Sequence, residues 1–66
     1  MILGKPRTYL INLRTKKGLK QRDVAKVLKI TTSYYGMIEL GTRDPRLKLA
    51  QKIAIFFGVK MEDVFF

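Results

Sequence analysis

The chain has 66 residues and a formal net charge of +9 at pH 7, and it contains neither cysteine nor histidine. A chain of this length forms one small domain, which buries only about 60% of the surface that the unfolded chain exposes. Without cysteine and histidine it has no disulfides, no thiolate or imidazole metal ligands, and no cysteine nucleophile or serine–histidine pair.

The positive charge is concentrated in the first two thirds of the chain. Residues 1–43 have a net charge of +8, whereas residues 44–66 have a net charge of +1. A strong positive charge indicates a polyanionic partner such as nucleic acid. The longest apolar run, residues 53–57, is far shorter than the roughly 20 residues that span a bilayer, and residues 1–3 are too short for a signal peptide. We therefore expect a cytoplasmic protein that does not bind membranes.

The five carboxylates offer little for acid–base or metal chemistry. Three are scattered along the chain, and the adjacent pair Glu62 and Asp63 would point to different faces of a helix. The sequence therefore predicts a protein that is not an enzyme, that needs no cofactor or metal, and that has no evident small-molecule ligand.

The first helix is expected over residues 6–17. Pro6 suits the first turn of a helix, where its missing N–H costs nothing. Leu10 and Leu13 follow at helical spacing, and Gly18 comes just after a basic last turn, as helix ends prefer.

A second helix is expected over residues 20–29, with Val24 and Leu28 on one face. Ile30 closes the turn that follows, and the hydroxyl of Thr31 is suited to cap the next helix. The third helix then runs from about Thr32 to Leu40 and ends at Gly41.

The two faces of this third helix differ sharply. Tyr35 and Ile38 form an apolar face that would dock on a core. The opposite face has small or flexible side chains and no charge, and consists of Thr32, Ser33, Gly36 and Met37. A merely solvated face would more often carry Lys or Glu, whereas a face that lies against DNA bases should fit closely, with charges around it.

A loop of residues 42–45 follows, and Pro45 is expected to open a fourth helix that ends near Phe57, before Gly58. Spacings of three and four residues predict its core positions as Leu47, Ala50, Ile53, Ala54 and Phe57. A short fifth helix is expected over residues 59–66, with Met61, Val64 and Phe65 facing inward. No alternating strand pattern competes, so the fold class is all-α, a compact bundle of five helices.

The ordered set of residues resembles the Cro and phage-repressor type of helix-turn-helix regulators, the Xre family. The resemblance rests on Leu13-Arg14, Gly18-Leu19, Gln21, Val24-Ala25, Leu28, Ile30-Thr31, Ile38-Glu39, Gly41, Pro45, Gly58-Val59 and residues 62–65. It covers residues 10–65 and implies a lambda-repressor-like bundle over residues 1–66, with the helix-turn-helix at about residues 20–40. Such a motif places its second helix in the DNA major groove.

The resemblance also implies roles for individual residues. Thr32, Ser33 and Met37 match base-reading positions, with Gly36 on the same face. The candidates for phosphate contact are Gln21, Tyr34, Thr42 and Arg43, with Lys20, Arg46 and Lys29 as weaker ones. Arg14 and Glu39 match a structural ion pair, although two unrelated surface charges are the alternative.

Three departures from the family pattern matter. Lys29 stands where the family often has glycine, so the turn is either strained or slightly different. Lys20 lacks the hydroxyl that commonly caps the second helix. Gly36 costs about 1 kcal/mol of helix propensity relative to alanine, which indicates either close backbone approach or chance. Since no base-reading residue is Gln, Arg or Lys, sequence preference should depend partly on DNA shape.

The C-terminal segment is rich in apolar residues. We expect a dimer interface formed by Phe56, Met61, Phe65 and Phe66, with the helix at about residues 60–66 packing against its mate; the alternative is that these residues only close the core. A twofold dimer would place two recognition helices about 34 Å apart on a palindromic operator. The sequence thus predicts a small dimeric repressor that binds double-stranded DNA. An antitoxin or accessory DNA-binding protein with a different protein partner is an alternative, and a cationic binder of RNA or membranes is another.

Overall fold

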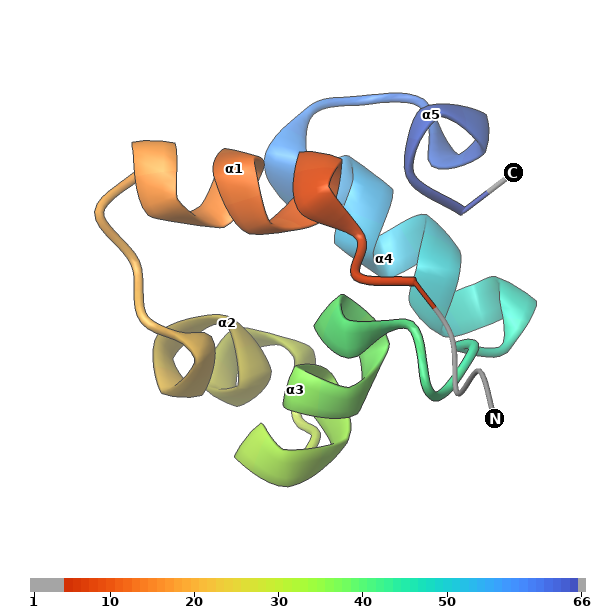
Figure 1. Ribbon diagram of the computed structural model, residues 1–66. Coiled ribbons are helices and arrows are strands. Elements are labelled where there is room, and N and C mark those ends of the chain that lie inside the picture. The colour runs from red at the N-terminus through yellow and green to blue at the C-terminus, as the bar shows by residue number, and fades with distance from the viewer. Residues whose placement is uncertain (1–4, 66) are drawn as a thin grey trace.

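The computed structural model describes residues 5–65, and in this range the chain forms five α-helices and no strand. The helices are α1 (Thr8–Lys16), α2 (Gln21–Leu28), α3 (Thr32–Leu40), α4 (Leu47–Phe57) and α5 (Met61–Phe65). Helix α4 runs through the middle, with α1 and α5 on one side and the α2–α3 pair on the other (Figure 1). The predicted all-α bundle with a helix-turn-helix in α2 and α3 is confirmed.

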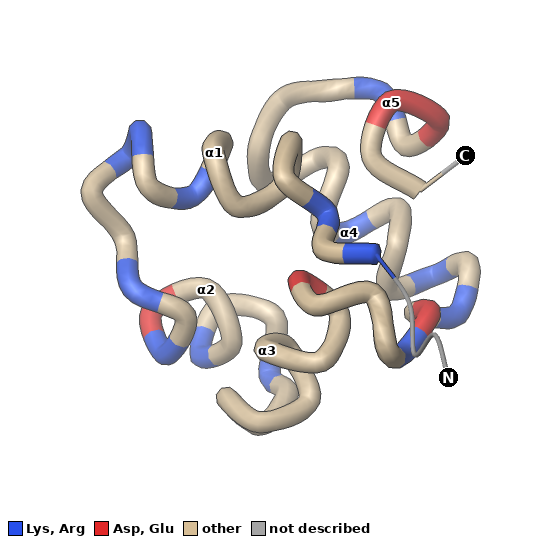
Figure 2. The backbone as a smooth tube through the Cα atoms, in the orientation of Figure 1, with Lys and Arg blue, Asp and Glu red and all other residues tan. Residues whose placement is uncertain are grey.

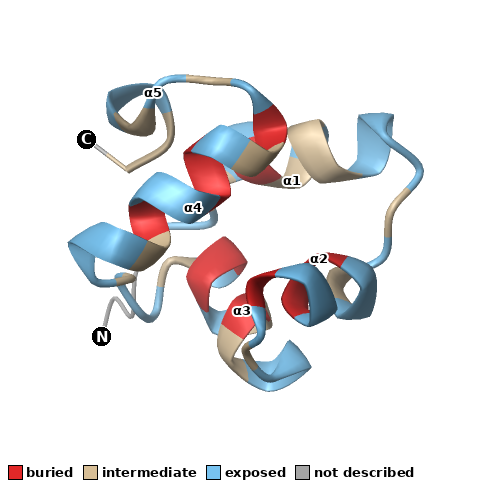
Figure 3. Ribbon diagram, turned by 180° about the vertical axis from the view of Figure 1, so that it is seen from behind, coloured by how far each residue is buried: buried red, intermediate tan, exposed pale blue. Residues whose placement is uncertain are grey.

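The core lies where these helices face one another. Its buried members are Leu10, Val24, Ala25, Leu28, Tyr35, Ile38, Ile53 and Phe57. Figure 3 shows the buried residues on the inward sides of α2, α3 and α4, while the outward sides are exposed. Val64 and Phe65 of α5 are half-buried and pack against this core, so the short fifth helix closes it from one end.

One predicted core position is wrong. Helix α4 begins at Leu47 and not at Pro45, because Arg46 has extended backbone and serves as the N-cap. Leu47 is 60% exposed, although its spacing to Ala50 places it on the core stripe. The first turn of α4 lies at the edge of the molecule (Figure 1), and Leu47 lines a surface hollow there together with Phe65 of α5.

The α2–α3 turn adopts the strained form of the two alternatives. Lys29 has a left-handed backbone, with φ of 61° and ψ of 42°. Within residues 5–65, every other residue with a positive φ is a glycine. This conformation costs an L-residue with a side chain about 1–2 kcal/mol. The hydroxyl of Thr31 then accepts a hydrogen bond from the Tyr34 N–H at 3.1 Å and caps α3, as predicted.

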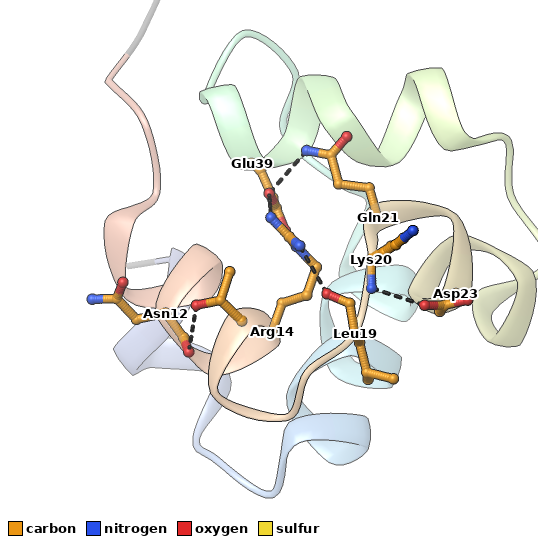
Figure 4. Close-up of polar contacts among 8 residues, drawn as sticks. Asn12, Arg14, Leu19, Lys20, Gln21, Asp23 and Glu39 are labelled. Atoms are coloured by element: carbon orange, nitrogen blue, oxygen red, sulfur yellow. Dashed lines mark hydrogen bonds and ion pairs between the residues drawn. The ribbon is translucent and has the colours of Figure 1, made fainter.

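The start of α2 makes up in part for its missing hydroxyl cap. The backbone N–H of Lys20 donates to the carboxylate of Asp23 at 2.8 Å (Figure 4). A carboxylate in the first turn also interacts favourably with the helix dipole. Helix α2 is therefore anchored at the end from which Gln21 projects.

Candidate nucleic-acid interface

The outer face of α3 is exposed and uncharged. Thr32, Ser33 and Met37 are exposed, and the helix carries no Lys or Arg along its length (Figure 2). Leu40 is exposed as well and extends this face toward the end of the helix. The candidate base-reading side chains thus lie together on a surface that is free to approach a ligand.

Gly36 belongs to this face only at its edge. It is half-buried, and a Cβ built on it would lie 3.3 Å from Oε1 of Gln21. The close approach is therefore made by the side chain of Gln21 from α2. A side chain at Gly36 would therefore press on the end of the Gln21 side chain, which would have to shift by a few tenths of an ångström. The predicted contact of Gly36 with DNA bases stays a prediction.

Gln21 is itself held by α3. Its Nε2 donates to Oε1 of Glu39 at 3.0 Å (Figure 4). One of the two amide N–H groups is used in this bond, and the second is left to donate elsewhere. Gln21 thus joins the start of α2 to the end of α3, which fixes the angle between the two helices of the motif.

Arg14 and Glu39 form a bidentate ion pair. Arg14 Nε lies 2.6 Å from Glu39 Oε2, and Arg14 Nη2 lies 3.1 Å from Oε1. The third donor, Arg14 Nη1, bonds the carbonyl oxygen of Leu19 at 2.9 Å (Figure 4). The carboxylate is almost fully buried, with its side chain 2% exposed. The pair therefore fixes α1, the turn after it and α3 relative to one another.

Burial alone would raise the pKa of Glu39, but hydrogen bonds from Arg14 and Gln21 outweigh it and hold the pKa below its ordinary value. The neighbouring Tyr35 hydroxyl is buried and makes no hydrogen bond of standard geometry within the described residues. Burial raises the pKa of this phenol, and the adjacent Glu39 carboxylate raises it further. Both groups therefore keep one protonation state at neutral pH.

The loop after α3 brings two candidate phosphate-contacting residues to the recognition helix. The backbone N–H and the hydroxyl of Thr42 both donate to the Met37 carbonyl, at 3.1 and 3.3 Å. The guanidinium of Arg43 lies 5.8 Å from the centroid of the Tyr34 ring, within cation–π range. Tyr34 and Arg43 are thus neighbours, and Arg43 places a positive charge beside α3.

The other basic candidates lie at helix starts. Lys20 is the N-cap residue of α2 and Arg46 the N-cap residue of α4, and both are exposed. Figure 2 shows basic residues at the start of α2 and in the loop before α4, on either side of α3, which has no Lys or Arg and whose one charged residue is the buried Glu39. The arrangement is a neutral surface with positive charge at its margins.

Two of the expected dimer residues, Phe56 and Phe65, line different hollows. Phe56 lines an apolar hollow between α2 and α4, which it shares with Val27, Leu28 and the 78% exposed Ile55. Phe65 lines a separate hollow at the start of α4, together with Leu47 and Ala50. Met61 is half-buried, and Phe66 lies outside the described residues.

Arg7 is a well-connected residue that the sequence reasoning missed. In the sequence, Arg7 contributes one positive charge and matches no motif. In the structure, its side chain forms hydrogen bonds with the last turn of α3 and with the loop that follows. No local pattern indicates this role, because the partners lie at least 31 residues away in the chain.

Within residues 5–65, no group of three or more carboxylate or other metal-ligating side chains is suitably placed to hold a metal ion. The described helices are also too short and too polar to cross a bilayer.

The chain matches the helix-turn-helix family model over residues 3–64. It is 52% identical over 52 residues to an uncharacterised HTH-type transcriptional regulator of Methanocaldococcus jannaschii, covering 79% of either chain. It is 39% identical to another such regulator, from Bacillus subtilis, over 88% of this chain and 82% of that one. The cryptic phage CTXphi transcriptional repressor RstR of Vibrio cholerae is 32% identical over 80% of this chain but only 48% of its own length. No solved structure matches. The chain therefore belongs to the helix-turn-helix family of DNA-binding transcriptional regulators, which are not enzymes.

Proposed function

We propose that the protein is a small dimeric repressor that binds a palindromic operator in double-stranded DNA, with α3 in the major groove. The observation that carries the proposal is the exposed, uncharged face of α3 with positive charge at its margins. A recognition surface needs close contact with base edges, and its affinity comes largely from phosphate contacts around that surface. Such a protein acts where the DNA is, in the cytoplasm.

The base-reading side chains offer limited chemistry. Thr32 and Ser33 donate and accept hydrogen bonds, whereas Met37 offers mainly apolar contact, which suits the methyl group of thymine. None of these side chains makes the bidentate contacts that best separate one base pair from another. We infer that sequence preference comes partly from DNA shape and deformability.

The phosphate contacts are assigned to residues around α3. Arg43 and Thr42 follow the helix, while Lys20, Gln21, Tyr34 and Arg46 lie at helix starts or in the first turn of α3. If about 6–10 phosphates are contacted, affinity should fall by about 10³–10⁵ between 50 and 200 mM salt. A steep salt dependence is therefore part of the proposal.

The dimer would form through α5 and the start of α4. Phe65 and Leu47 line the same hollow, and Leu47 is exposed although it is apolar. Met61 lies on the same helix as Phe65 and would extend this surface. A twofold interface uses the same patch on both subunits. The hollow of each subunit would therefore be buried against that of its partner.

The proposal is tested by selecting binding sites from random duplex DNA, followed by titration of the selected duplex at several salt concentrations. We expect palindromic sites whose half-sites lie about one DNA turn apart. Arg43→Ala should weaken binding to all sequences alike and reduce the salt slope by about one unit. Lys60→Ala removes an exposed charge from the loop before α5 and should leave the slope unchanged. Failure to enrich any sequence would contradict sequence-specific binding.

An accessory or antitoxin role with a different protein partner is a second candidate. It is favoured by the exposed Ile55 and the apolar hollow between α2 and α4, which the proposed dimer leaves open. Its test is the composition of the protein purified from its native source. A stoichiometric second protein that Ile55→Glu releases would support this role, and a homodimer alone would count against it.

A further inference from the structure

Arg7 lies where the segment before α1 crosses the end of α3. It is the N-cap residue of α1, and its backbone N–H donates to the carbonyl oxygen of Glu39 at 2.7 Å. The crossing is close, because a Cβ built on Gly41 would overlap the carbonyl oxygen of Lys5. Gly41 also has a left-handed backbone, with φ of 79°. A side chain at this position would therefore displace the segment.

The side chain of Arg7 holds the loop that carries Arg43. Its Nη1 donates to the carbonyl oxygens of Ile38, at 2.6 Å, and Arg43, at 3.2 Å. Its Nη2 pairs with the carboxylate of Asp44. The last turn of a helix carries its negative dipole end, so a guanidinium there is favourably placed, and it gives the Ile38 carbonyl a second donor beside the Gly41 N–H at 3.2 Å.

The same guanidinium reaches the fifth helix. Its carbon Cζ lies 5.0 Å from the centroid of the Phe65 ring, within cation–π range. With this ring on one side and the loop on the other, the Arg7 side chain is only 14% exposed. Arg7 is therefore placed to act on other residues and is poorly placed to contact DNA itself.

We propose that Arg7 is a positioning residue for DNA binding, which holds the α3–α4 loop in the geometry that lets Arg43 contact a phosphate. This inference rests on the proposed function, and it assigns part of the affinity to a residue that does not touch DNA. The planar guanidinium is required, because it bonds two carbonyls and a carboxylate at once, whereas an ammonium lacks this fixed fork.

The first test is Arg7→Lys, which keeps the charge and removes the fork. We expect affinity for the selected duplex to fall about three- to tenfold, with a salt slope smaller by about one unit, as if Arg43 no longer contacted its phosphate. If Arg7 contributes only charge, the lysine variant will bind as the wild type does, and that result would overturn the inference.

A second pair of variants decides the matter even if Arg7→Lys fails to fold. Asp44→Ala and Asp63→Ala each remove one exposed carboxylate and raise the net charge by one unit. Charge alone would make both variants bind a polyanion more tightly. The inference predicts that Asp44→Ala, which removes an anchor of Arg7, binds more weakly than Asp63→Ala, and equal or tighter binding would refute it.

Amide hydrogen exchange in the free protein separates this inference from the proposed function. The N–H groups of Thr42 and Arg43 both donate to the Met37 carbonyl, at 3.1 and 3.4 Å. In Arg7→Lys these two amides should exchange faster, while core amides such as that of Leu28 keep their protection. Unchanged exchange in the loop would refute loop anchoring. Wild-type protein that does not bind DNA would instead refute the proposed function and leave this result standing.

Discussion

At the scale of single residues, the buried carboxylate of Glu39 holds the motif together. It accepts hydrogen bonds from Arg14 of α1 and Gln21 of α2, and it lies one residue before the end of α3. Three helices therefore depend on one charge, and that charge is stable inside the protein only while its partners remain in place.

Removal of the charge should be costly. We expect Glu39→Gln to lower the free energy of unfolding by about 3 kcal/mol, because Arg14 is left largely buried without a counter-charge. Asp63→Asn, an equal change on an exposed residue, should stay within about 0.5 kcal/mol of the wild type. Denaturant melts of the three proteins measure both values, and equal stability of the two variants would contradict the role of the ion pair.

The same carboxylate predicts how stability depends on pH. Because the pKa of Glu39 is lower in the folded protein than its ordinary value of 4.5, the unfolded chain binds the proton more strongly. Its stabilising contribution is therefore complete above pH 4.5 and is lost as the pH falls below that value. Thermal melts between pH 7 and pH 3 should show this loss in the wild type and a weaker dependence in Glu39→Gln. Parallel curves would show that other carboxylates dominate.

A further residue-scale prediction concerns the left-handed Lys29. Lys29→Gly should stabilise the protein by about 0.5–1 kcal/mol, since the gain from relieved strain exceeds the entropy that glycine loses on folding. Lys26→Gly, at an exposed helical position of α2, should instead destabilise it by about 1 kcal/mol. Thermal unfolding midpoints that move in opposite directions would support the strained turn, whereas two losses of similar size would not.

At the scale of elements, the sequence predicts helix α3 better than its surroundings. Thr31 and Gly41 are strong local signals for the start and end of a helix, and α3 has the predicted bounds. The start of α4 carries no such signal, because Pro45 is compatible with the first turn of a helix and also with the extended backbone before one. The error at Leu47 follows from a helical spacing that continues past the edge of the core.

Contacts between distant segments explain what the sequence could not predict at the site. The packing of Gln21 against Gly36 depends on how closely α2 and α3 approach. Arg7 depends on carbonyl groups that become available only when α3 ends next to it. The ion pair of Arg14 and Glu39 was expected from the family pattern alone, since nothing local joins residues 25 positions apart.

At the scale of the whole molecule, each of the two apolar hollows is a candidate for a protein–protein interface. Leu47 and Ile55 are both exposed apolar residues of α4, but each lies at a different hollow. Their exposure means that a charged substitution at either position should leave the monomer folded.

This pair tests which hollow forms the dimer. Leu47→Glu should abolish dimers, because it places a charge in the proposed interface with Phe65, whereas Ile55→Glu should leave them intact. Analytical ultracentrifugation at micromolar concentration, with and without the selected duplex, measures the oligomeric state of both variants. Dimers that are lost in Ile55→Glu and kept in Leu47→Glu would move the interface to the hollow of Phe56, and monomers throughout would exclude the proposed dimer.

The most direct test of the account is whether α3 reads base pairs. Glutamine recognises adenine by two hydrogen bonds in the major groove, so Ser33→Gln should create a new preference for adenine. Site selection with this variant should change the preferred base at one position of each half-site and keep the spacing of the half-sites. Ile55→Gln should select the same sites as the wild type. If Ser33→Gln also selects wild-type sites with unchanged affinity, α3 does not lie against the bases and the account is contradicted.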